Sequence, residues 1–189
     1  MNIKQLIITN IEQHLNTIRG LSKNNIEEVI NACNKINETI LKKNKILLCG
    51  NGGSAADAQH IAAEFTGRFL KERIPLPAIA LSTDTSALTA IGNDYGFDKV
   101  YSRQLEALFN PGDILIAIST SGNSKNIIEA VNMNNKLGGE TICLLGNDGG
   151  ELNKICSNSI VVRSDITARI QEAHILIGHI FCNSVDNLF

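Results

Sequence analysis

The chain has 189 residues, of which 43% are hydrophobic, and a formal net charge of −2. This length favours one domain and is sufficient to bury a hydrophobic core. The near-neutral charge argues against general nucleic-acid binding, which needs a basic face, and any anionic ligand has to be held by local groups. Residues 1–15 are too polar for a signal peptide, and no apolar run approaches the roughly 20 residues of a membrane span. We therefore expect a cytoplasmic protein whose partners include neither nucleic acid nor membrane.

Residues 1–43 carry apolar side chains at helical spacing in two stretches. The first stretch has Ile3, Leu6, Ile7, Ile11 and Leu15. Ser22 is the expected N-cap of the second. Both helices precede the alternation of strands and helices described next. We expect residues 1–43 to form a helical extension that packs in an oligomer, and residues 44–189 to form an α/β domain.

Five short apolar runs without clean alternation follow, at residues 45–49, 77–81, 113–119, 141–146 and 159–163. Such runs are typical of parallel strands that are buried on both faces. Helical patterns lie between them at 54–70, about 84–108 with interruptions, and 124–137, and a last one covers 166–188. This alternation predicts a doubly wound α/β fold with a parallel sheet of about five strands.

The five cysteines are odd in number and widely spaced, and they contain no CxxC pair. This pattern is not a disulfide framework. Cys49 and Cys143 lie inside strand-like runs, where a thiol behaves as a small hydrophobe. We expect reduced, buried thiols, as in cytoplasmic proteins.

The first loop with ligand-binding character is GNGGS, residues 50–54, between a strand and a helix. Its glycines allow positive φ and let backbone N–H groups approach a ligand. Ser54 is the expected N-cap, with Asp57 completing a capping-box pattern, and the helix N-terminus is then suited to an anion. A tight turn with a good cap explains the loop almost equally well. The loop lacks the third glycine of a dinucleotide motif and the Gly-Lys-Ser/Thr of a Walker loop.

The second such loop is STSGNS, residues 119–124, which also joins a strand to a helix. Ser124 alone would be enough to cap the helix. The hydroxyls of Ser119, Thr120 and Ser121 exceed what capping needs. Hydroxyl and backbone N–H groups can hold a phosphate without a positive charge, so this loop favours phosphate binding.

His60 and Glu64 are four residues apart, so they share one helix face and can meet one ligand. This spacing suits Zn²⁺, although an exposed polar pair is the commoner explanation. On the last predicted helix, Gln171, His174 and His179 interrupt an apolar pattern. His174 is interpreted as a packed histidine.

The combination of CGNGGS, HxxxExxGR, GND, STSGNS and RIQExH resembles the sugar isomerase (SIS) domain family and, more narrowly, the phosphoheptose isomerases. The resemblance covers nearly the whole chain. It implies a flavodoxin-like three-layer αβα sandwich with a five-stranded parallel sheet, and a homotetramer. It also implies conversion of D-sedoheptulose 7-phosphate to D-glycero-D-manno-heptose 7-phosphate through an enediol, the first step of nucleotide-activated heptose synthesis for lipopolysaccharide core or capsule.

The resemblance further implies one Zn²⁺ per subunit and a set of substrate contacts. The implied metal ligands are His60, Glu64, Gln171 and His179. The implied substrate contacts are Asn51, Gly52, Gly53, Asn93, Asp94, Ser119, Thr120, Ser121 and Ser124, with Ser54, Glu64, Arg68 and Gln171 as further candidates near the ligand. Arg68 has an alternative explanation as a solvated charge at a helix end, and Asp94 as an ordinary turn residue.

Ketose–aldose isomerisation needs a base near C1 and a proton donor at the C2 oxygen. We assign Glu64 as the base and His179 as the acid. A zinc-bound carboxylate is a poorer base, so either the metal acts as a Lewis acid on the sugar oxygens or it releases Glu64 when substrate binds.

On a straight helix, Gln171 and His179 would be about 12 Å apart along the axis and roughly 80° apart around it. This separation favours sites that combine residues from two subunits.

Two other functions remain open from the sequence. One is a non-catalytic SIS-domain protein, either a phosphosugar-sensing regulator or a replication-initiator-associating protein, which would not need the four metal-type residues. The other is an amino-sugar-phosphate isomerase or lyase.

Overall fold

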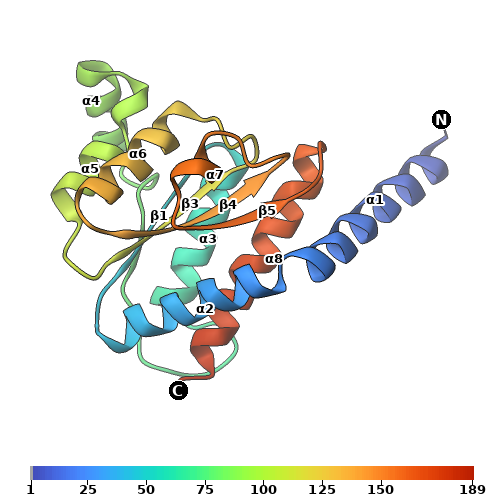
Figure 1. The fold of residues 1–189 in the computed structure, drawn as a ribbon, viewed down its shortest axis with the longest axis horizontal. Helices are drawn as coiled ribbons and strands as arrows, with labels where there is room; N and C mark the ends of the chain where they lie inside the picture. Colours follow the sequence, from blue (N-terminus) through green and yellow to red (C-terminus); the bar gives the residue numbers. More distant parts are fainter. Residues whose placement is uncertain (1) are drawn as a thin grey trace.

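The structure, a computed structural model, describes residues 2–189 and has a parallel five-stranded sheet between two layers of helices (Figure 1). The strands are Ile46–Gly50 (β1), Ala78–Ala80 (β2), Ile114–Ser119 (β3), Glu140–Gly146 (β4) and Asn158–Val162 (β5). The helices are Ile3–Asn24 (α1), Ile26–Leu41 (α2), Gly53–Thr66 (α3), Thr85–Tyr95 (α4), the 3-10 turn Phe97–Lys99 (η1), Ser102–Leu108 (α5), Lys125–Lys136 (α6), Leu152–Ile155 (α7) and Thr167–Asp186 (α8). The strand order is β2-β1-β3-β4-β5, which confirms the predicted doubly wound, flavodoxin-like sheet.

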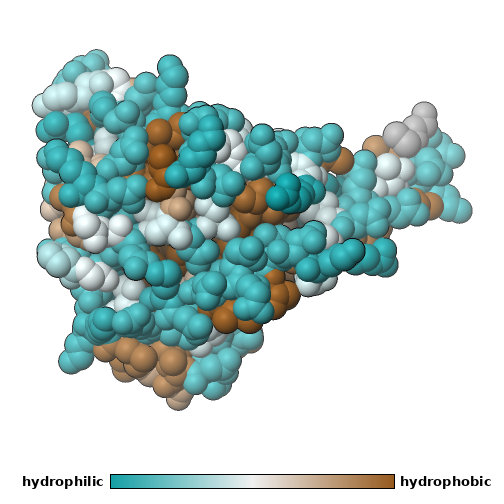
Figure 2. Space-filling model, viewed as in Figure 1, coloured by the Kyte–Doolittle hydropathy of each residue, from teal (hydrophilic) through white to brown (hydrophobic). Residues whose placement is uncertain are grey.

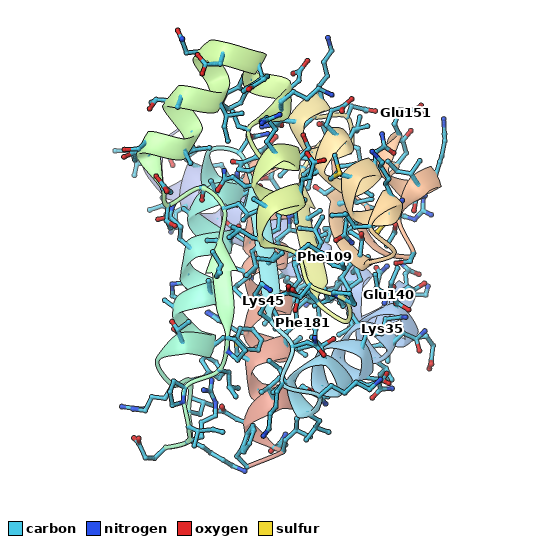
Figure 3. The ribbon with its side chains drawn as sticks, turned by 90° about the vertical axis from the view of Figure 1, so that its left-hand side faces the viewer. Lys35, Lys45, Phe109, Glu140, Glu151 and Phe181 are labelled. Carbon is cyan, nitrogen blue, oxygen red and sulfur yellow. The ribbon has the colours of Figure 1, made fainter. Side chains whose placement is uncertain are left out.

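The sheet is buried on both faces, which explains why its strands lack polar alternation. Along β3, Ile114, Ile116 and Ile118 join a core cluster with α2, α3 and α8. The intervening Leu115 and Ala117 join a second cluster with α5, α6 and α7. Phe181 of α8 is fully buried in the first cluster (Figure 3).

The two N-terminal helices begin and end differently from the sequence prediction. Asn2 caps α1, because its side chain accepts a hydrogen bond from Gln5 N. α1 then continues through Ser22 to Asn24, so the prediction of Ser22 as a helix N-cap is wrong. The Ser22 hydroxyl instead donates to the Arg19 carbonyl, a bond that a serine makes readily inside a helix.

α2 belongs to the first core cluster, whereas most of α1 extends away from the body of the molecule (Figure 1). The apolar stripe predicted on α1 is exposed in the chain by itself; its large members are Ile3, Leu6, Ile7, Ile11 and Leu15. Within residues 2–189, no helix is both long and apolar enough to cross a membrane.

All five cysteines are free thiols. Cys49 and Cys143 lie in β1 and β4 and are completely buried, as the sequence predicted. Burial raises the pKa of Cys49 to about 12, so this thiol remains uncharged and packs as an apolar group.

His174 is a packed histidine, as expected. Its ring is fully buried, and its Nε2 lies 3.0 Å from the Leu145 carbonyl oxygen, to which it can donate. Burial lowers the pKa of His174 to about 4, an effect that the bond to Leu145 partly opposes. In the unfolded chain the pKa is about 6.5, so the unfolded state binds a proton first as the pH falls.

We expect His174 to make the protein acid-sensitive. Its contribution to the free energy of unfolding is complete above about pH 6.5 and falls by about 3 kcal/mol as the pH drops to about 4. Chemical denaturation of the wild type and of His174→Gln across this range measures the effect. The stability difference between the two proteins should shrink toward acid, and a difference independent of pH would contradict the assignment. Comparing the two removes the opposite contribution of Asp57, whose pKa is raised and which both proteins retain.

Candidate active site

The two glycine- and serine-rich loops lie next to each other at the carboxyl edge of the sheet. β1 ends at Gly50 and β3 ends at Ser119, and these strands are neighbours in the sheet. The chain continues from β1 to β2 on one side and from β3 to β4 on the other, so the strand order reverses between β1 and β3. Such a switch point is where doubly wound folds bind ligands.

The first loop differs in detail from the sequence prediction. Gly52 is the N-cap residue of α3, and its φ of 56° is a conformation that favours glycine. Ser54 therefore lies within the first turn, buried, and the prediction that it caps α3 is wrong. The predicted capping box is also absent, because Asp57 Oδ2 is buried without a hydrogen-bond partner. Burial raises the pKa of Asp57 to about 6, against the opposing effect of His60.

The second loop keeps its hydroxyls available. Ser124 is the N-cap residue of α6, as predicted, but its side chain makes no capping bond. Its Oγ instead lies 3.2 Å from Ser119 Oγ. The exposed Ser121 accepts a hydrogen bond from Asn123 N at 3.2 Å. Thr120 is half-buried between them.

A pair of asparagines joins the two loops. Asn51 and Asn126 exchange two amide hydrogen bonds, each 2.8 Å long. Sequence analysis missed Asn126, because an asparagine in the first turn of a helix carries no distinctive signal. The pair holds the start of α3 against the start of α6, which fixes the relative position of the loops.

His60, Glu64 and His179 form a compact cluster on α3 and α8. The two helices pack closely, since a Cβ at Gly178 would overlap the Ile61 side chain. His60 Nε2 lies 3.1 Å from His179 Nε2 and 3.2 Å from Glu64 Oε1. His60 and Glu64 of the HxxxE motif on α3 thus meet His179 of α8 within a single chain.

Phe69 completes this cluster and was not identified from the sequence. Its ring stacks on His179, with centroids 5.4 Å apart and planes inclined by 25°. Phe69 follows α3 in an irregular segment, and nothing in the local pattern of residues predicts this contact.

Gln171 lies away from the histidines. A Cβ at Gly53 would overlap the Gln171 amide, so this side chain lies against the first turn of α3. α8 is continuous between Gln171 and His179, as the helical-geometry argument assumed. In one chain, Gln171 therefore contacts the glycine loop, and His179 contacts His60.

Three other candidates lie outside the cluster and the loops. Arg68 is exposed and faces Glu72, with 3.6 Å between Nε and Oε2. Asn93 and Asp94 are exposed on α4, where the Asn93 amide donates to Asp94. Asp94 is helical, so the alternative of an ordinary turn residue is wrong.

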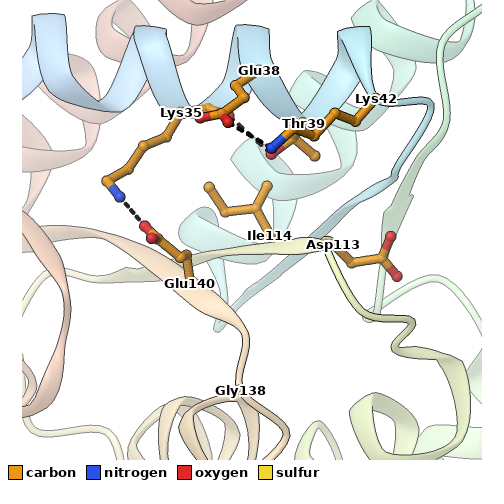
Figure 4. Close-up of a pocket in the computed structure, with 9 residues that line it drawn as sticks. Lys35, Glu38, Thr39, Lys42, Asp113, Ile114, Gly138 and Glu140 are labelled. Atoms are coloured by element: carbon orange, nitrogen blue, oxygen red, sulfur yellow. Dashed lines mark hydrogen bonds and ion pairs between the residues drawn. The ribbon is translucent and has the colours of Figure 1, made fainter.

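A separate pocket at the amino edge of the sheet has a different character (Figure 4). It is lined by the first residues of β3 and β4 and by one face of α2. Lys35 pairs with Glu140, and Lys42 with Glu38, so its charges are already neutralised. Ligands of parallel sheets bind at the opposite edge, and we place the active site there.

Comparison with known proteins shows the family of the chain. The SIS domain family matches residues 10–146. A phosphoheptose isomerase from Campylobacter concisus is 53% identical over 187 residues, which cover 99% of this chain and 98% of that protein. A second, from Nitratiruptor, is 61% identical over 152 residues, 80% of this chain and 81% of that protein. The solved structure of a phosphoheptose isomerase from Neisseria gonorrhoeae has a TM-score of 0.93 and 43% identity, covering 98% of this chain and 100% of that one. The chain belongs to the phosphoheptose isomerase family of SIS-domain proteins.

Proposed function

We propose that this protein isomerises D-sedoheptulose 7-phosphate to D-glycero-D-manno-heptose 7-phosphate. The observation that carries the proposal is the His60, Glu64 and His179 cluster on α3 and α8, together with two phosphate-type loops, in the first of which α3 begins. Relatives more than 50% identical over most of the chain have the name of this activity. A non-catalytic phosphosugar sensor would not need the cluster.

The loops are proposed to bind the phosphate. Ser119, Ser121 and Ser124 supply hydroxyls, and the N-termini of α3 and α6 supply backbone N–H groups and the positive ends of helix dipoles. The Asn51–Asn126 pair keeps both helix ends at one place. This arrangement holds a dianion in a chain that has no net positive charge.

Ser121→Ala and Ser124→Ala should weaken substrate binding more than they slow the chemistry. Each lost hydrogen bond to a charged group costs about 1.5–3 kcal/mol, which corresponds to a roughly 10- to 150-fold rise in KM. Steady-state kinetics separates KM from kcat. Ser22→Ala, on α1, is the control and should behave as wild type. A reduced kcat with an unchanged KM would assign these serines to the chemical step instead.

Glu64 and His179 are proposed to carry the proton transfers. Glu64 takes the proton from C1 as the C1–C2 double bond of the enediol forms, and then returns a proton to C2. His179 donates to the C2 oxygen as the carbonyl becomes a hydroxyl, and then takes the proton from the C1 hydroxyl as the aldehyde forms. The side chain of Glu64 is 26% exposed, so it is shielded yet accessible to a ligand.

Two separations within the cluster suit a Zn²⁺ ion. Ligand atoms around tetrahedral zinc lie about 3.3 Å apart, close to the separations of His60 Nε2 from His179 Nε2 and Glu64 Oε1. Among residues 2–189, no group of three or more His, Cys, Asp or Glu side chains is already arranged to hold a metal ion, so binding needs these side chains to turn toward one point. We propose His60, Glu64 and His179 as ligands. Gln171 lies against Gly53 in its own chain, so it can be the fourth ligand only if it leaves that position or comes from another subunit.

A zinc ion there would supply a Lewis acid for the oxygens on C1 and C2. Metal analysis of the purified protein tests the assignment. About one zinc per chain is expected for the wild type, and much less for His60→Ala.

We further propose a homotetramer in which the exposed stripe of α1 is buried between subunits. Figure 2 shows hydrophobic surface on this helix and near the C-terminal end of the molecule. A stripe this large is uncommon on a monomer. The reduced thiols and the phosphorylated substrate suit a cytoplasmic enzyme that supplies heptose for lipopolysaccharide core or capsule.

Ile7→Lys should break the assembly. A charge in the middle of a buried apolar stripe is expensive to desolvate, so the variant should have a smaller molar mass by light scattering. Gln5→Lys, at another exposed position of α1, is the control. A monomeric wild type, or a tetrameric Ile7→Lys, would contradict the proposed interface.

Incubation of the purified protein with sedoheptulose 7-phosphate tests the activity itself. Loss of the ketose and appearance of the aldose are expected, with no reaction of unphosphorylated sedoheptulose at the same concentration. An inactive protein that still binds the sugar phosphate would favour the sensor function.

A further inference from the structure

A buried ion pair joins the end of α8 to the segment that follows α3. Arg73 Nε lies 2.8 Å from Asp186 Oδ1, and the two side chains are 0% and 1% exposed. The other carboxylate oxygen accepts hydrogen bonds from the backbone N–H groups of Leu70 and Lys71, at 2.8 and 2.9 Å. Buried ion pairs rarely stabilise a protein more than apolar residues of equal volume, because desolvation offsets their attraction. The groups that this ion pair holds in place explain its presence better than a gain in stability does.

Arg73 caps the C-terminus of α3, where Glu64 lies. The last carbonyls of a helix need partners from outside the helix. Gly67 follows α3 with φ of −87°, so it does not form the usual left-handed glycine cap. Arg73 takes this role, donating from Nη2 to the Glu64 carbonyl at 2.8 Å and from Nη1 to the Phe65 carbonyl at 2.9 Å. The backbone that carries the Glu64 carboxylate is therefore held by this guanidinium.

Asp186 fixes the segment that carries Phe69. The two N–H groups bound by its carboxylate belong to the residues that directly follow Phe69. The Phe69 ring stacks on His179, which lies two turns before Asp186 on α8. The ion pair thus has a connection to each of the two proposed acid–base groups.

We propose that Arg73 and Asp186 are positioning residues for the isomerisation, which set the Glu64 carboxylate and the His179 ring relative to each other. The inference rests on the acid–base roles proposed above. Neither residue needs to touch the sugar. A displacement of about 1 Å in a catalytic group can cost about 100-fold in rate. The phosphate loops lie at the opposite end of α3, so substrate binding should change little.

Asp186→Asn tests the proposal, since it keeps the shape of the side chain and replaces one acceptor oxygen by an N–H donor. That donor then faces either the guanidinium or the two backbone N–H groups. We expect kcat to fall at least ~10-fold while KM stays within about twofold.

Asp113→Asn is a matched control at the amino edge of the sheet. Like Asp186, Asp113 is buried, pairs with one cation, Lys45, and accepts hydrogen bonds from two backbone N–H groups, those of Lys45 and Asn110. Both variants should lose stability, but only Asp186→Asn should lose turnover. Equal losses of kcat in the two would overturn the proposal and leave the pair a purely structural role.

Two further measurements test the proposal, and the first does not depend on how stable Asp186→Asn is. Phe69→Leu should lower kcat, whereas Phe69→Tyr, which keeps an aromatic ring against His179, should restore it. Imidazole NMR resonances of His179, assigned by their loss in His179→Gln, should shift in Asp186→Asn and not in Asp113→Asn. Unchanged His179 resonances in Asp186→Asn would overturn the proposal even if the enzyme were slow.

The wild type and Glu64→Gln separate this inference from the proposed function. Near-normal turnover of Glu64→Gln would refute the acid–base assignment, while the His179 resonances would still report whether the ion pair positions the ring. An active wild type with an inactive Glu64→Gln, but unchanged kcat in Asp186→Asn, would refute the positioning role alone.

Discussion

Glu64→Gln should keep the fold and lose at least ~100-fold in turnover, as expected for removal of a general base. The substitution preserves the size of a side chain that is 26% exposed, so little packing is lost. The amide cannot take a proton from C1 of the sugar. Rates of ketose loss at saturating substrate measure the effect, and circular dichroism checks the fold. His179→Gln should behave similarly, because it removes the proton donor at the C2 oxygen.

Glu72→Gln is a matched control on the same side of the molecule. Glu72 is 89% exposed and faces Arg68 rather than the histidine cluster. Its loss should leave turnover near that of the wild type. Near-normal turnover of Glu64→Gln, or a loss in Glu72→Gln as large as in Glu64→Gln, would refute the role given to Glu64.

The positions of the strands could be predicted from the sequence because they depend on local composition. Residues 46–49 and 114–118 are apolar at every position, and this pattern has few explanations other than a parallel strand buried on both faces. The structure has strands at Ile46–Gly50 and Ile114–Ser119. Once these strands are neighbours at the switch point, the two loops that follow them must lie together.

Helix ends were predicted less well, since several residues near an end can act as the cap. Ser54 has the best capping side chain in its loop, but the chain needs the positive φ that Gly52 supplies. Gly52 is therefore the N-cap residue, and α3 begins at Gly53. Ser22 has the same preference for the N-cap position, but α1 is capped by Asn2 and continues through Ser22 to Asn24. Local propensity is a weak signal where tertiary packing decides.

Several contacts between distant residues were beyond the sequence argument. Arg73 and Asp186 are 113 positions apart, and each alone has the appearance of an ordinary surface charge. Asn51 and Asn126 are 75 positions apart, and no residue pattern indicates that their side chains meet. The position of Gln171 against Gly53 follows from how α3 and α8 pack, which no residue pattern specifies.

Gly122→Ala should damage both stability and phosphate binding. Gly122 has φ of 66°, and an added Cβ would overlap the Gly149 carbonyl oxygen of the neighbouring loop. The loop cannot simply move away, because the Gly122 carbonyl accepts a hydrogen bond from Leu152 N at 3.0 Å. Left-handed strain costs about 1–2 kcal/mol and overpacking about 1–3 kcal/mol, so we expect a loss of about 2–5 kcal/mol. Thermal unfolding at fixed protein concentration should show Tm lower by roughly 5–15 °C.

Gly52→Ala separates the cost of backbone strain from the cost of steric overlap. Gly52 has a similar φ of 56°, but a Cβ there meets nothing within 4 Å, so only the cost of the left-handed backbone remains. Its Tm should fall by about 40–50% as much as that of Gly122→Ala. For Gly122→Ala, KM for sedoheptulose 7-phosphate should also rise, because the displaced backbone carries Ser121 with it. Equal Tm values for the two variants would mean that the STSGNS loop has room to relax, and that its close contact with Gly149 does not hold the phosphate site in shape.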